Sequence, residues 1–521
     1  MRKVRVLTPR EAVDLIKNGD TVVTEGFVSN TCPETLTSAL EAKFLETGTP
    51  NQLTYVYAGG QGARNGRGCD HFGHEGMVKR AVGGQWDRGP RLCQLAVENK
   101  IEAYNLPQGI LSHLFRDIAA HKLGTLTHTG LHTFVDPRNG GGKLNAKTTE
   151  DLVILVNIEG QERLLYKSFP IDVCLLKGTY ADESGNISLE KETAPYDTTA
   201  IAMATKNSGG KVLVQVERIV ANGSLNPNLV KIPGIYVDAV VIGTPEESVQ
   251  CIGYPYDGSM CGEYRVPAGT FDPLPFNVKK IIARRAAMEL KPNAIVNLGV
   301  GVPELVSAVA AEEGIGDFLT LTVEAGPIGG FPKKGEQFGG ASNAECILDQ
   351  NQQFDFYHGG GLDIAFLGLA ETDTDGNINV SKFGTRLSGS GGFIDITQNA
   401  KKVCFCGTFT ASGLKVEVKD GKLVIVQEGK IRKFVEAVQH ITFSGIYARQ
   451  VKQPVKYITE RAVFELRSDG VHLTEVAPGI DVDTQILALM DFKPIITDEL
   501  KTMDLRIFSE ALMGIKEELA Q

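Results

Sequence analysis

Short aliphatic and β-branched runs recur along the chain, separated by glycine turns and by stretches with helical patterning. The segment Lys17–Leu36 contains a helix-like stretch, a short strand pattern, a glycine turn and a Pro-Glu pair that opens another helix. Lys291–Leu305 repeats the same order, with Pro303-Glu304 in the place of Pro33-Glu34. The chain therefore contains an internal repeat, which bears directly on its fold.

A second pair of segments repeats without a gap. Asp172–Ser188 matches Asp363–Asn379 position by position, and the match extends to Lys211–Glu217 and Lys402–Thr408. Each copy has the pattern of a strand, a polar glycine turn, a second strand and, further on, a buried strand. Alternating strand and helix patterns of this kind predict an α/β fold with mostly parallel, open sheets.

The repeats predict two similar α/β domains fused in one chain. We expect an N-terminal half over residues 1–244 and a C-terminal half over residues 280–521. The segment 245–279 between them is rich in proline, glycine and aspartate, which is typical of a connecting segment.

Composition narrows the possible functions. The net charge is −10, which argues against binding to nucleic acid or to an anionic membrane surface. No apolar stretch approaches the length of about 18 residues needed to span a bilayer, and the N-terminal segment does not resemble a secretion signal. The nine cysteines form no C-x-x-C pair, so we expect reduced thiols and a cytoplasmic protein.

Several common motifs are missing from the sequence. There is no G-x-G-x-x-G, no complete phosphate-binding P-loop and no G-x-S-x-G, which argues against dinucleotide binding and against a serine hydrolase. His71 and His74 lie three residues apart beside an acid, for which we favour a structural or surface role over metal binding. Cys404 and Cys406 alternate within an apolar strand pattern, so we expect them to be buried.

The 58 glycines exceed the usual share of about 7%, and many fall in turns at predicted strand ends. Ligands of open parallel sheets bind beyond such ends, where glycine lets backbone N–H groups approach closely. Glu324 is the first residue after the strand pattern 319–323, and the glycine turn after it includes Gly326. A carboxylate in that place can act as a nucleophile or base, although a solvated turn glutamate is the common alternative.

Three further turns could supply binding groups. Residues 388–392 hold Gly389, Gly391 and Gly392, whose N–H groups could bind an oxyanion. The turn of Asn297, Gly299, Val300 and Gly301 precedes Pro303 at a predicted helix start, where a phosphate or carboxylate could bind. Gln108, between a proline and a glycine, could donate a hydrogen bond. Tight turn geometry alone would explain the two glycine turns equally well, and for Gln108 simple surface exposure is the more common alternative.

The whole chain resembles family I coenzyme A transferases, and within them the single-chain propionate (acetate-type) enzymes. The most specific matches are Thr322–Gly330, Gly359–Gly384 and Lys402–Lys415. Two departures from the ketoacid-type enzymes are Val323 and Ala325 around the glutamate, in place of serine and asparagine, and Glu25 before Gly26-Phe27, in place of glycine. The departures favour the propionate/acetate branch over a 3-oxoacid specificity.

The resemblance implies a mechanism and its residues. Glu324 would be the covalent nucleophile that forms a glutamyl-CoA thioester, with ping-pong kinetics. Gln108 and either Gly391 or Gly392 would bind the oxyanions. Asn297, Gly299, Val300 and Gly301 would lie near coenzyme A, together with Gly389 and Gly326.

The resemblance also implies the partners. The substrates would be short-chain acyl-CoA donors and carboxylate acceptors such as acetate and propionate. Coenzyme A would arrive as part of the substrate, with no permanently bound cofactor or metal, and we expect a homo-oligomer. Two other functions stay open, namely a short-chain acyl-CoA hydrolase on the same scaffold and a non-catalytic CoA or metabolite sensor.

Overall fold

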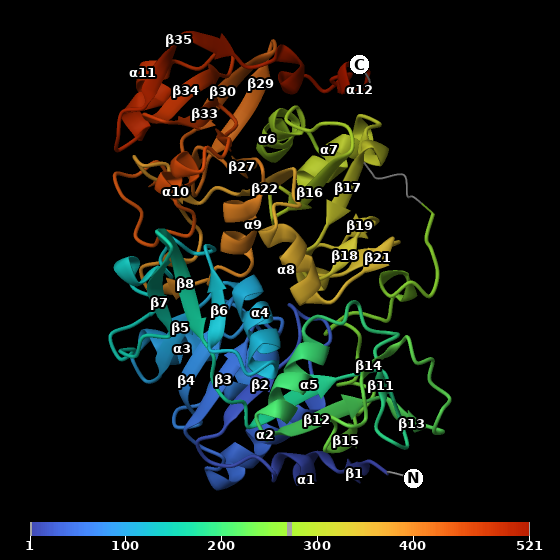
Figure 1. The fold of residues 1–521 in the computed structure, drawn as a ribbon. Helices are drawn as coiled ribbons and strands as arrows, with labels where there is room; N and C mark the ends of the chain where they lie inside the picture. Colours follow the sequence, from blue (N-terminus) through green and yellow to red (C-terminus); the bar gives the residue numbers. More distant parts are fainter. Residues whose placement is uncertain (1–2, 268–272, 520–521) are drawn as a thin grey trace. The chain divides into compact units, whose positions relative to one another are not determined.

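The structure is a computed structural model that describes residues 3–267 and 273–519 (Figure 1). The chain divides into two compact units. Unit 1 comprises Met1–Val266, Val323–Asp355 and Gly384–Asp395, and unit 2 comprises Pro267–Thr322, Phe356–Phe383 and Ile396–Gln521.

These units differ in their bounds from the halves expected at 1–244 and 280–521, because two segments of the second half fold with the first. The bounds 1–244 and 280–521 therefore stay a prediction, which rests on the repeat in the sequence. Of the expected connecting segment 245–279, residues 268–272 lie outside the described residues.

Unit 1 is built on an eight-stranded sheet in which every neighbouring pair is parallel. The strand order is β1 (Arg5–Leu7), β15 (Ala239–Ile242), β12 (Lys211–Val216), β9 (Val173–Lys177), β2 (Thr21–Thr24), β3 (Leu53–Tyr57), β4 (Val78–Gly83) and β5 (Glu102–Asn105). Parallel sheets of this kind need helices on both faces, since the central strands carry apolar side chains on both sides.

Helices cover both faces of this sheet. Residues of α1 (Pro9–Val13), α2 (Glu34–Thr47) and α3 (Pro90–Val97) share one apolar core with Val22, Tyr55 and Leu175. The alternate strand residues face the opposite way, because side chains alternate along a strand. α5 (Thr198–Asn207) contacts β9 and β12 and packs beside α4 (Gln108–Ala119), and both helices lie in front of the sheet in Figure 1.

Smaller sheets complete unit 1. β6 (Gly124–Thr127), β8 (Gln161–Lys167) and β7 (Val153–Ile158) form an antiparallel sheet, and a second small sheet has the order β13 (Arg218–Val220), β10 (Tyr180–Asp182), β11 (Ile187–Ser188) and β14 (Val230–Ile232). The later segments of the chain add the pairs β18 (Pro327–Ile328) with β21 (Cys346–Ile347) and β19 (Phe331–Pro332) with β20 (Ala341–Ser342), and the short strand β26 (Arg386–Leu387).

Unit 2 contains a sheet that is parallel over its first strands, antiparallel on both sides of one later strand and parallel again at its edge. The order is β17 (Leu319–Thr322), β16 (Ala294–Leu298), β22 (Ile364–Gly368), β27 (Val403–Cys406), β32 (Val455–Ile458), β33 (Ala462–Arg467), β34 (Gly470–Val476) and β35 (Ile495–Thr502). The pairs from β17 to β32 are parallel, β33 is antiparallel to both of its neighbours, and β34 and β35 are parallel. Cys404 and Cys406 are buried in β27, which confirms the buried-strand interpretation.

Shorter elements surround this sheet. α6 (Val278–Ala287) packs against α7 (Leu305–Glu312), and residues of both helices join the apolar core of the sheet. The unit also contains α10 (Gly445–Gln450), α11 (Val482–Gln485), α12 (Ile515–Leu519), β25 (Lys382–Phe383) and the strand pairs β23 (Glu371–Thr372) with β24 (Ile378–Asn379), β28 (Thr410–Ala411) with β31 (Ile431–Arg432), and β29 (Lys415–Lys419) with β30 (Lys422–Gln427). α8 (Gln350–His358) and α9 (Phe393–Asn399) are divided between the two units.

The repeat seen in the sequence is also a repeat of structure, and the predicted α/β class with mostly parallel sheets is confirmed. The order β12-β9-β2-β3 in unit 1 corresponds to β27-β22-β16-β17 in unit 2. Asp172 accepts a hydrogen bond from the backbone N–H of Thr21 (2.8 Å), and Asp363 accepts the equivalent one from Ile295 (2.9 Å). Within the described residues, no helix is long and apolar enough to cross a membrane.

Candidate active site

Glu324 lies in unit 1, on the turn that follows Val323. The side chains on both sides of it, Val323 and Ala325, are buried in a small apolar cluster with Phe27 and Tyr196. Phe27 and Tyr196 stack with their ring centroids 5.9 Å apart. Only 8% of Glu324 is exposed, so this carboxylate is largely removed from solvent by a turn that packing holds on both sides.

The turn itself depends on Gly326. Val323 donates a backbone hydrogen bond to the carbonyl of Pro327 (2.9 Å), and Gly326 donates one to Val323 (3.0 Å). Gly326 has a φ of +131°, and a Cβ there would lie 2.2 Å from the backbone oxygen of Leu348. Only glycine fits this position, because any side chain would both strain the backbone and collide with it.

Gln108 is buried at the first turn of α4 and exposes 1% of its surface. It follows β5 by three residues, which places it at the carboxyl edge of the parallel sheet, where such sheets bind ligands. Its backbone N–H donates to the carbonyl oxygen of Gly391 (3.0 Å), and its side-chain Nε2 donates to Oε1 of Gln350 (3.0 Å). The surface alternative for Gln108 is therefore wrong.

The turn at residues 388–392 packs against the same sheet edge. Ser390 N–H donates to Oδ1 of Asn105 (3.0 Å), at the end of β5, and Gly391 N–H donates to the carbonyl of Gly84 (2.9 Å), just after β4. A Cβ on Gly389 would lie 2.8 Å from the Gly84 oxygen, whereas one on Gly391 would lie 3.7 Å from Oε1 of Gln108. The structure thus brings this turn and Gln108 together. The Gly391 N–H is already used, and among the described residues Gly392 N–H has no hydrogen-bond acceptor.

Two buried carboxyl groups belong to this neighbourhood, and neither is predicted from the sequence. Glu25 directly follows β2 and is 3% exposed, and Asp197 precedes α5 and is fully buried. Glu25 accepts hydrogen bonds from the backbone N–H groups of Gly26 (2.9 Å) and Asp197 (3.1 Å). The one sequence signal was the unusual acid before Gly26-Phe27. For Asp197 there was no signal, because its partners are distant along the chain.

The environment of both acids disfavours their charged forms. Burial, followed by repulsion from Asp197, raises the pKa of Glu25 well above its ordinary value. Burial also raises the pKa of Asp197 to about 6, against hydrogen bonds from Ser112 and Gln350 that favour its ionised form. Carboxyl groups with raised pKa values beside a candidate nucleophile are typical of an active site.

The turn at Asn297–Gly301 lies in unit 2, where it opens onto a cavity of about 320 Å³. The cavity lies beyond the carboxyl ends of β16, β22 and β27, and its lining includes Val300, Gly368, Gly407 and Lys433. Asn297 itself is 1% exposed, and its Nδ2 donates to the backbone oxygen of Thr322 (3.3 Å). Val300 is 60% exposed and can contact a ligand, whereas Asn297 is buried and stabilises the turn through its hydrogen bond to Thr322.

Lys433 is the buried cation of this cavity, and the exposed Lys279 also lines it. Lys433 is 6% exposed, and its Nζ donates to the carbonyl of Thr408 (2.7 Å). Burial lowers the pKa of Lys433 to about 8, although attraction from Glu460 opposes the shift. The helix expected at Pro303 begins two residues later, at Leu305.

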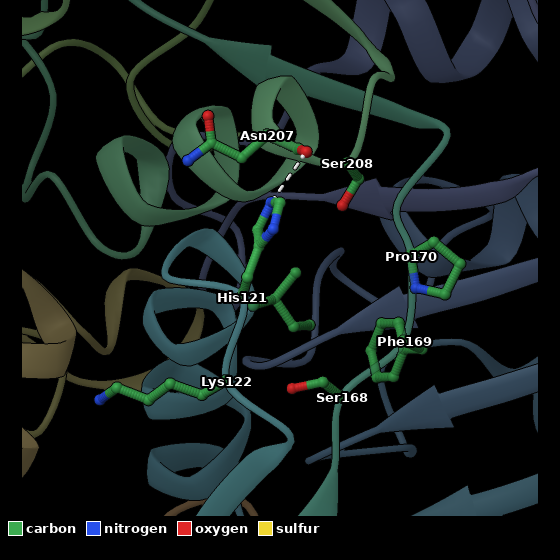
Figure 2. A pocket seen from close by; sticks show the side chains of 8 residues that line it. His121, Lys122, Ser168, Phe169, Pro170, Asn207 and Ser208 are labelled. Carbon is green, nitrogen blue, oxygen red and sulfur yellow. Dashed lines mark hydrogen bonds between the residues drawn. The ribbon is translucent and has the colours of Figure 1, made fainter.

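A second cavity, of about 420 Å³, lies in unit 1 beside the carboxyl end of α4 (Figure 2). It is lined by residues that include His121, Lys122, Phe169 and Asn207, and His121 is hydrogen-bonded to the Asn207 carbonyl (3.1 Å). Gln108 begins α4, so about 18 Å of helix separates it from this cavity. None of the predicted site residues lines it.

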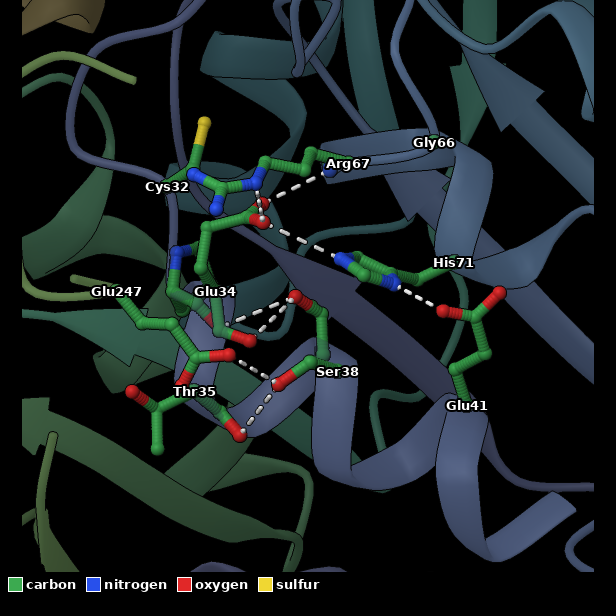
Figure 3. Close-up of polar contacts among 12 residues, drawn as sticks. Cys32, Glu34, Thr35, Ser38, Glu41, Gly66, Arg67, His71 and Glu247 are labelled. Carbon is green, nitrogen blue, oxygen red and sulfur yellow. Dashed lines mark hydrogen bonds and ion pairs between the residues drawn. The ribbon is translucent and has the colours of Figure 1, made fainter. Parts of the chain in front are cut away.

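His71 and His74 have the structural role that the sequence favoured. His71 contacts Glu34 (3.2 Å) and Glu41 (2.5 Å) (Figure 3), and His74 also contacts Glu41 (2.5 Å). Burial opposes the charged imidazole, but the hydrogen bonds to Glu34 and Glu41 outweigh it and raise the pKa of His71 to about 9. No group of metal-binding geometry occurs among residues 3–267 and 273–519.

Comparison with known proteins agrees with this fold. A family model described as coenzyme A transferase matches residues 6–243. The acetate CoA-transferase YdiF of Escherichia coli O157:H7 is 45% identical over 513 residues, which cover 98% of this chain and 96% of YdiF. The caffeate CoA-transferase of Acetobacterium woodii is 44% identical over 517 residues, 98% of each protein.

The solved structures agree with the sequences. The crystal structure of the acyl-CoA transferase YdiF from E. coli O157:H7, in a thioester complex with CoA, superposes with a TM-score of 0.93 at 44% identity. The match covers 98% of this chain and 97% of that one. The chain therefore belongs to the coenzyme A transferase family. It is a CoA-transferase, and the resemblance seen in the sequence is confirmed.

Proposed function

We propose that the protein transfers coenzyme A between short-chain acyl-CoA donors and carboxylate acceptors of the acetate and propionate type. Glu324 is the covalent nucleophile in this proposal. The observation that carries the proposal is that the Glu324 carboxylate is nearly buried on a rigid glycine turn. Its neighbours Val323 and Ala325 anchor this turn in an apolar cluster, which also contains Tyr196, the residue directly before Asp197. The thioester complex of the related YdiF supports a thioester intermediate.

The reaction proceeds in two matched halves. A carboxylate oxygen of Glu324 attacks the acyl-CoA carbonyl and displaces the CoA thiolate, which leaves an acyl-glutamyl anhydride. The thiolate then attacks the glutamyl carbonyl, releases the first acid as its carboxylate and forms the glutamyl-CoA thioester. An acceptor carboxylate reverses these steps, which regenerates Glu324 and yields the new acyl-CoA.

Each carbonyl attack creates an oxyanion, which needs fixed donors. We assign the Gln108 side-chain amide and the Gly392 N–H to this role. The amide nitrogen of Gln108 carries two N–H groups, and the contact with Gln350 uses one of them. Gly392 is preferred over Gly391 because the Gly391 N–H donates to Gly84. Gly389 and Gly326 then shape the two turns and need not contact coenzyme A.

The cavity of unit 2 is the proposed site for part of coenzyme A. Val300 and Gly301 form one side, supported by Asn297 and Gly299, and Lys433 supplies a positive charge for an anionic or carbonyl group. Lys433→Met is therefore expected to raise KM for acyl-CoA about tenfold with little change in kcat. Lys419, which is exposed, provides the matched control as Lys419→Met. A homo-oligomeric state and a cytoplasmic location stay predictions.

Covalent trapping tests the proposal. The protein is incubated with acetyl-CoA, digested and analysed by mass spectrometry, with and without borohydride reduction. We expect a CoA adduct on the peptide that contains Glu324, and loss of this adduct when acetate or propionate is added in excess. Full turnover with an unmodified Glu324 would overturn the mechanism. CoA release that is independent of the acceptor would identify a hydrolase instead.

A further inference from the structure

We propose that Asp197 and Gln350 are positioning residues that determine which end of the Gln108 side-chain amide faces the reacting carbonyl. The inference rests on the proposed function, in which that amide binds an oxyanion. It concerns the line of contacts from Gln108 through Gln350 to Asp197 and Ser112, referred to below as the amide–carboxylate chain.

The amide–carboxylate chain is continuous and buried. Gln108 Nε2 donates to Oε1 of Gln350 (3.0 Å), and Gln350 Nε2 donates to Oδ2 of Asp197 (2.6 Å). The hydroxyl of Ser112 donates to the other carboxylate oxygen, Oδ1. The exposed fraction is 1% or less for all four residues, so water has little access to compete for these contacts.

The direction of this chain follows from chemistry. An ionised carboxylate only accepts hydrogen bonds, so Gln350 must turn its NH₂ group towards Asp197. Its carbonyl oxygen then faces Gln108, which in turn must present its own NH₂ group. Without the carboxylate, both amides could rotate by half a turn and still contact each other. The Gln108 atom next to Gln350 would then be the carbonyl oxygen, which has no second N–H to donate to a developing negative charge.

The carboxylate is itself held firmly in place. The backbone N–H of Asp197 donates to Glu25 (3.1 Å), and the backbone N–H of Gln350 donates to the carbonyl of Tyr196 (2.9 Å). Tyr196 also packs in the cluster that anchors the residues on both sides of Glu324. The same segments therefore support the nucleophile and the direction of the proposed oxyanion donor.

Burial of the Asp197 carboxylate costs free energy, which attraction from His113 and the hydrogen bonds from Ser112 and Gln350 offset only in part. A purely structural contact at this position would be made as well by apolar side chains of similar shape. The carboxylate has an effect that apolar packing cannot reproduce, because it sets the donor direction of both amides.

Gln350→Met is the main test, since methionine fills a similar volume and makes neither hydrogen bond. We expect kcat for CoA transfer to fall about 10- to 100-fold, with KM for acyl-CoA changed little, because the lost contact matters only in the transition state. Asp197→Asn is a second, nearly isosteric variant. It retains a carbonyl oxygen but no longer enforces one direction, so a reduced kcat is expected here too.

A double-variant cycle shows whether Gln350 acts through Gln108. Gln108→Ala alone is expected to lower kcat about 100- to 1,000-fold. If the inference holds, adding Gln350→Met to Gln108→Ala causes no further loss, because the group that Gln350 orients has gone. Losses that multiply in the double variant would overturn the inference, as would a wild-type kcat in folded Gln350→Met.

Gln352→Met is the matched control, since it makes the same substitution at an exposed glutamine of the same helix, α8, outside the amide–carboxylate chain. We expect its kcat to stay close to that of the wild type, and a loss as large as that of Gln350→Met would point to general disruption. Failure of the proposed function is recognised separately, because the wild-type enzyme would then form no adduct on Glu324. A wild type that forms the adduct beside an active Gln350→Met rejects the positioning role alone.

Discussion

Two clusters of unit 1 hold largely buried carboxylates in opposite electrostatic environments. In the imidazole–carboxylate cluster of Glu34, Glu41, His71 and His74, the acids face cations or potential cations, and Arg91 adds a further contact to Glu41 (3.0 Å). In the amide–carboxylate chain, the side chains that donate hydrogen bonds to Asp197 are neutral, and attraction from His113 offsets the burial of this carboxylate only in part. Both groups are well ordered by hydrogen bonds, so the difference between them is one of charge.

The pKa values show this difference. Burial raises the pKa of Glu41, but hydrogen bonds and attraction from His71 and His74 outweigh it and lower the value to about 2. For Asp197 burial dominates and raises the pKa to about 6. The first environment stabilises charge and contributes to folding. The second makes charge costly, which proteins tolerate chiefly where function requires it.

The largest expected effect separates catalysis from folding. Glu324→Ala should reduce turnover by about 10⁴-fold or more, because the proposed nucleophile is absent, while the thermal unfolding midpoint changes little. Glu324→Asp should also be severely impaired, since its carboxylate lies about 1.5 Å short of the required position. Steady-state kinetics and thermal unfolding measured on the same samples check both statements.

Glu34→Gln is the reciprocal control for the Glu324 variants. Glu34 belongs to the imidazole–carboxylate cluster, so this variant should retain the wild-type kcat and lose stability instead. Activity near that of the wild type in either Glu324 variant would contradict the assignment of Glu324 as the nucleophile.

The second effect is on stability. Glu34 is 3% exposed and contacts His71 and the backbone N–H of Gly68, so Glu34→Gln leaves a buried imidazolium poorly compensated. We expect a loss of about 3 kcal/mol in the free energy of unfolding, measured by urea titration. Glu46, which is 66% exposed on the same helix α2, provides the control as Glu46→Gln, with an expected loss of at most about 1 kcal/mol. Equal losses in the two variants would contradict the assignment.

The sequence predicted the residues at the glycine turns much better than the buried residues that support them. Patterns within a few residues mark Glu324 and the glycine turn, the family resemblance singled out Gln108, and the repeat that contains Asp172 and Asp363 predicted the repeated strand order. Asp197 and Gln350 are 153 positions apart, and their meeting depends on how the later segments of the chain fold into unit 1. Long-range contacts of this kind leave no local pattern, so they could not be predicted from spacing alone.

The third effect is a pH dependence of stability that comes from His71. Its pKa is about 9 in the folded protein and 6.5 without the fold, so its contribution is fully present below pH 6.5 and is lost as the pH rises through 9. We expect the wild type to lose about 2 kcal/mol relative to His71→Gln over that interval. Urea unfolding at a series of pH values measures the difference, and a constant difference would show that His71 is neutral in the fold.

The smallest effect has the opposite sign and comes from Asp197. Its pKa is raised from 3.8 to about 6 on folding, so the folded state binds the proton more tightly, and stability falls as the pH rises from 3.8 to 6. Asp197→Asn lacks this loss. Its stability relative to the wild type should therefore rise by up to about 2 kcal/mol over that interval and stay level above it.

The same substitution is expected to lower kcat, because an amide at position 197 no longer fixes the direction of Gln350 and Gln108. Suppose that Asp197→Asn gains stability relative to the wild type as the pH rises to neutral, and that its kcat is lower. The ionised carboxylate then costs stability and is retained because it raises the rate of the reaction. A stability difference that falls with rising pH would place Asp197 with the imidazole–carboxylate cluster instead, as a charge that the fold favours.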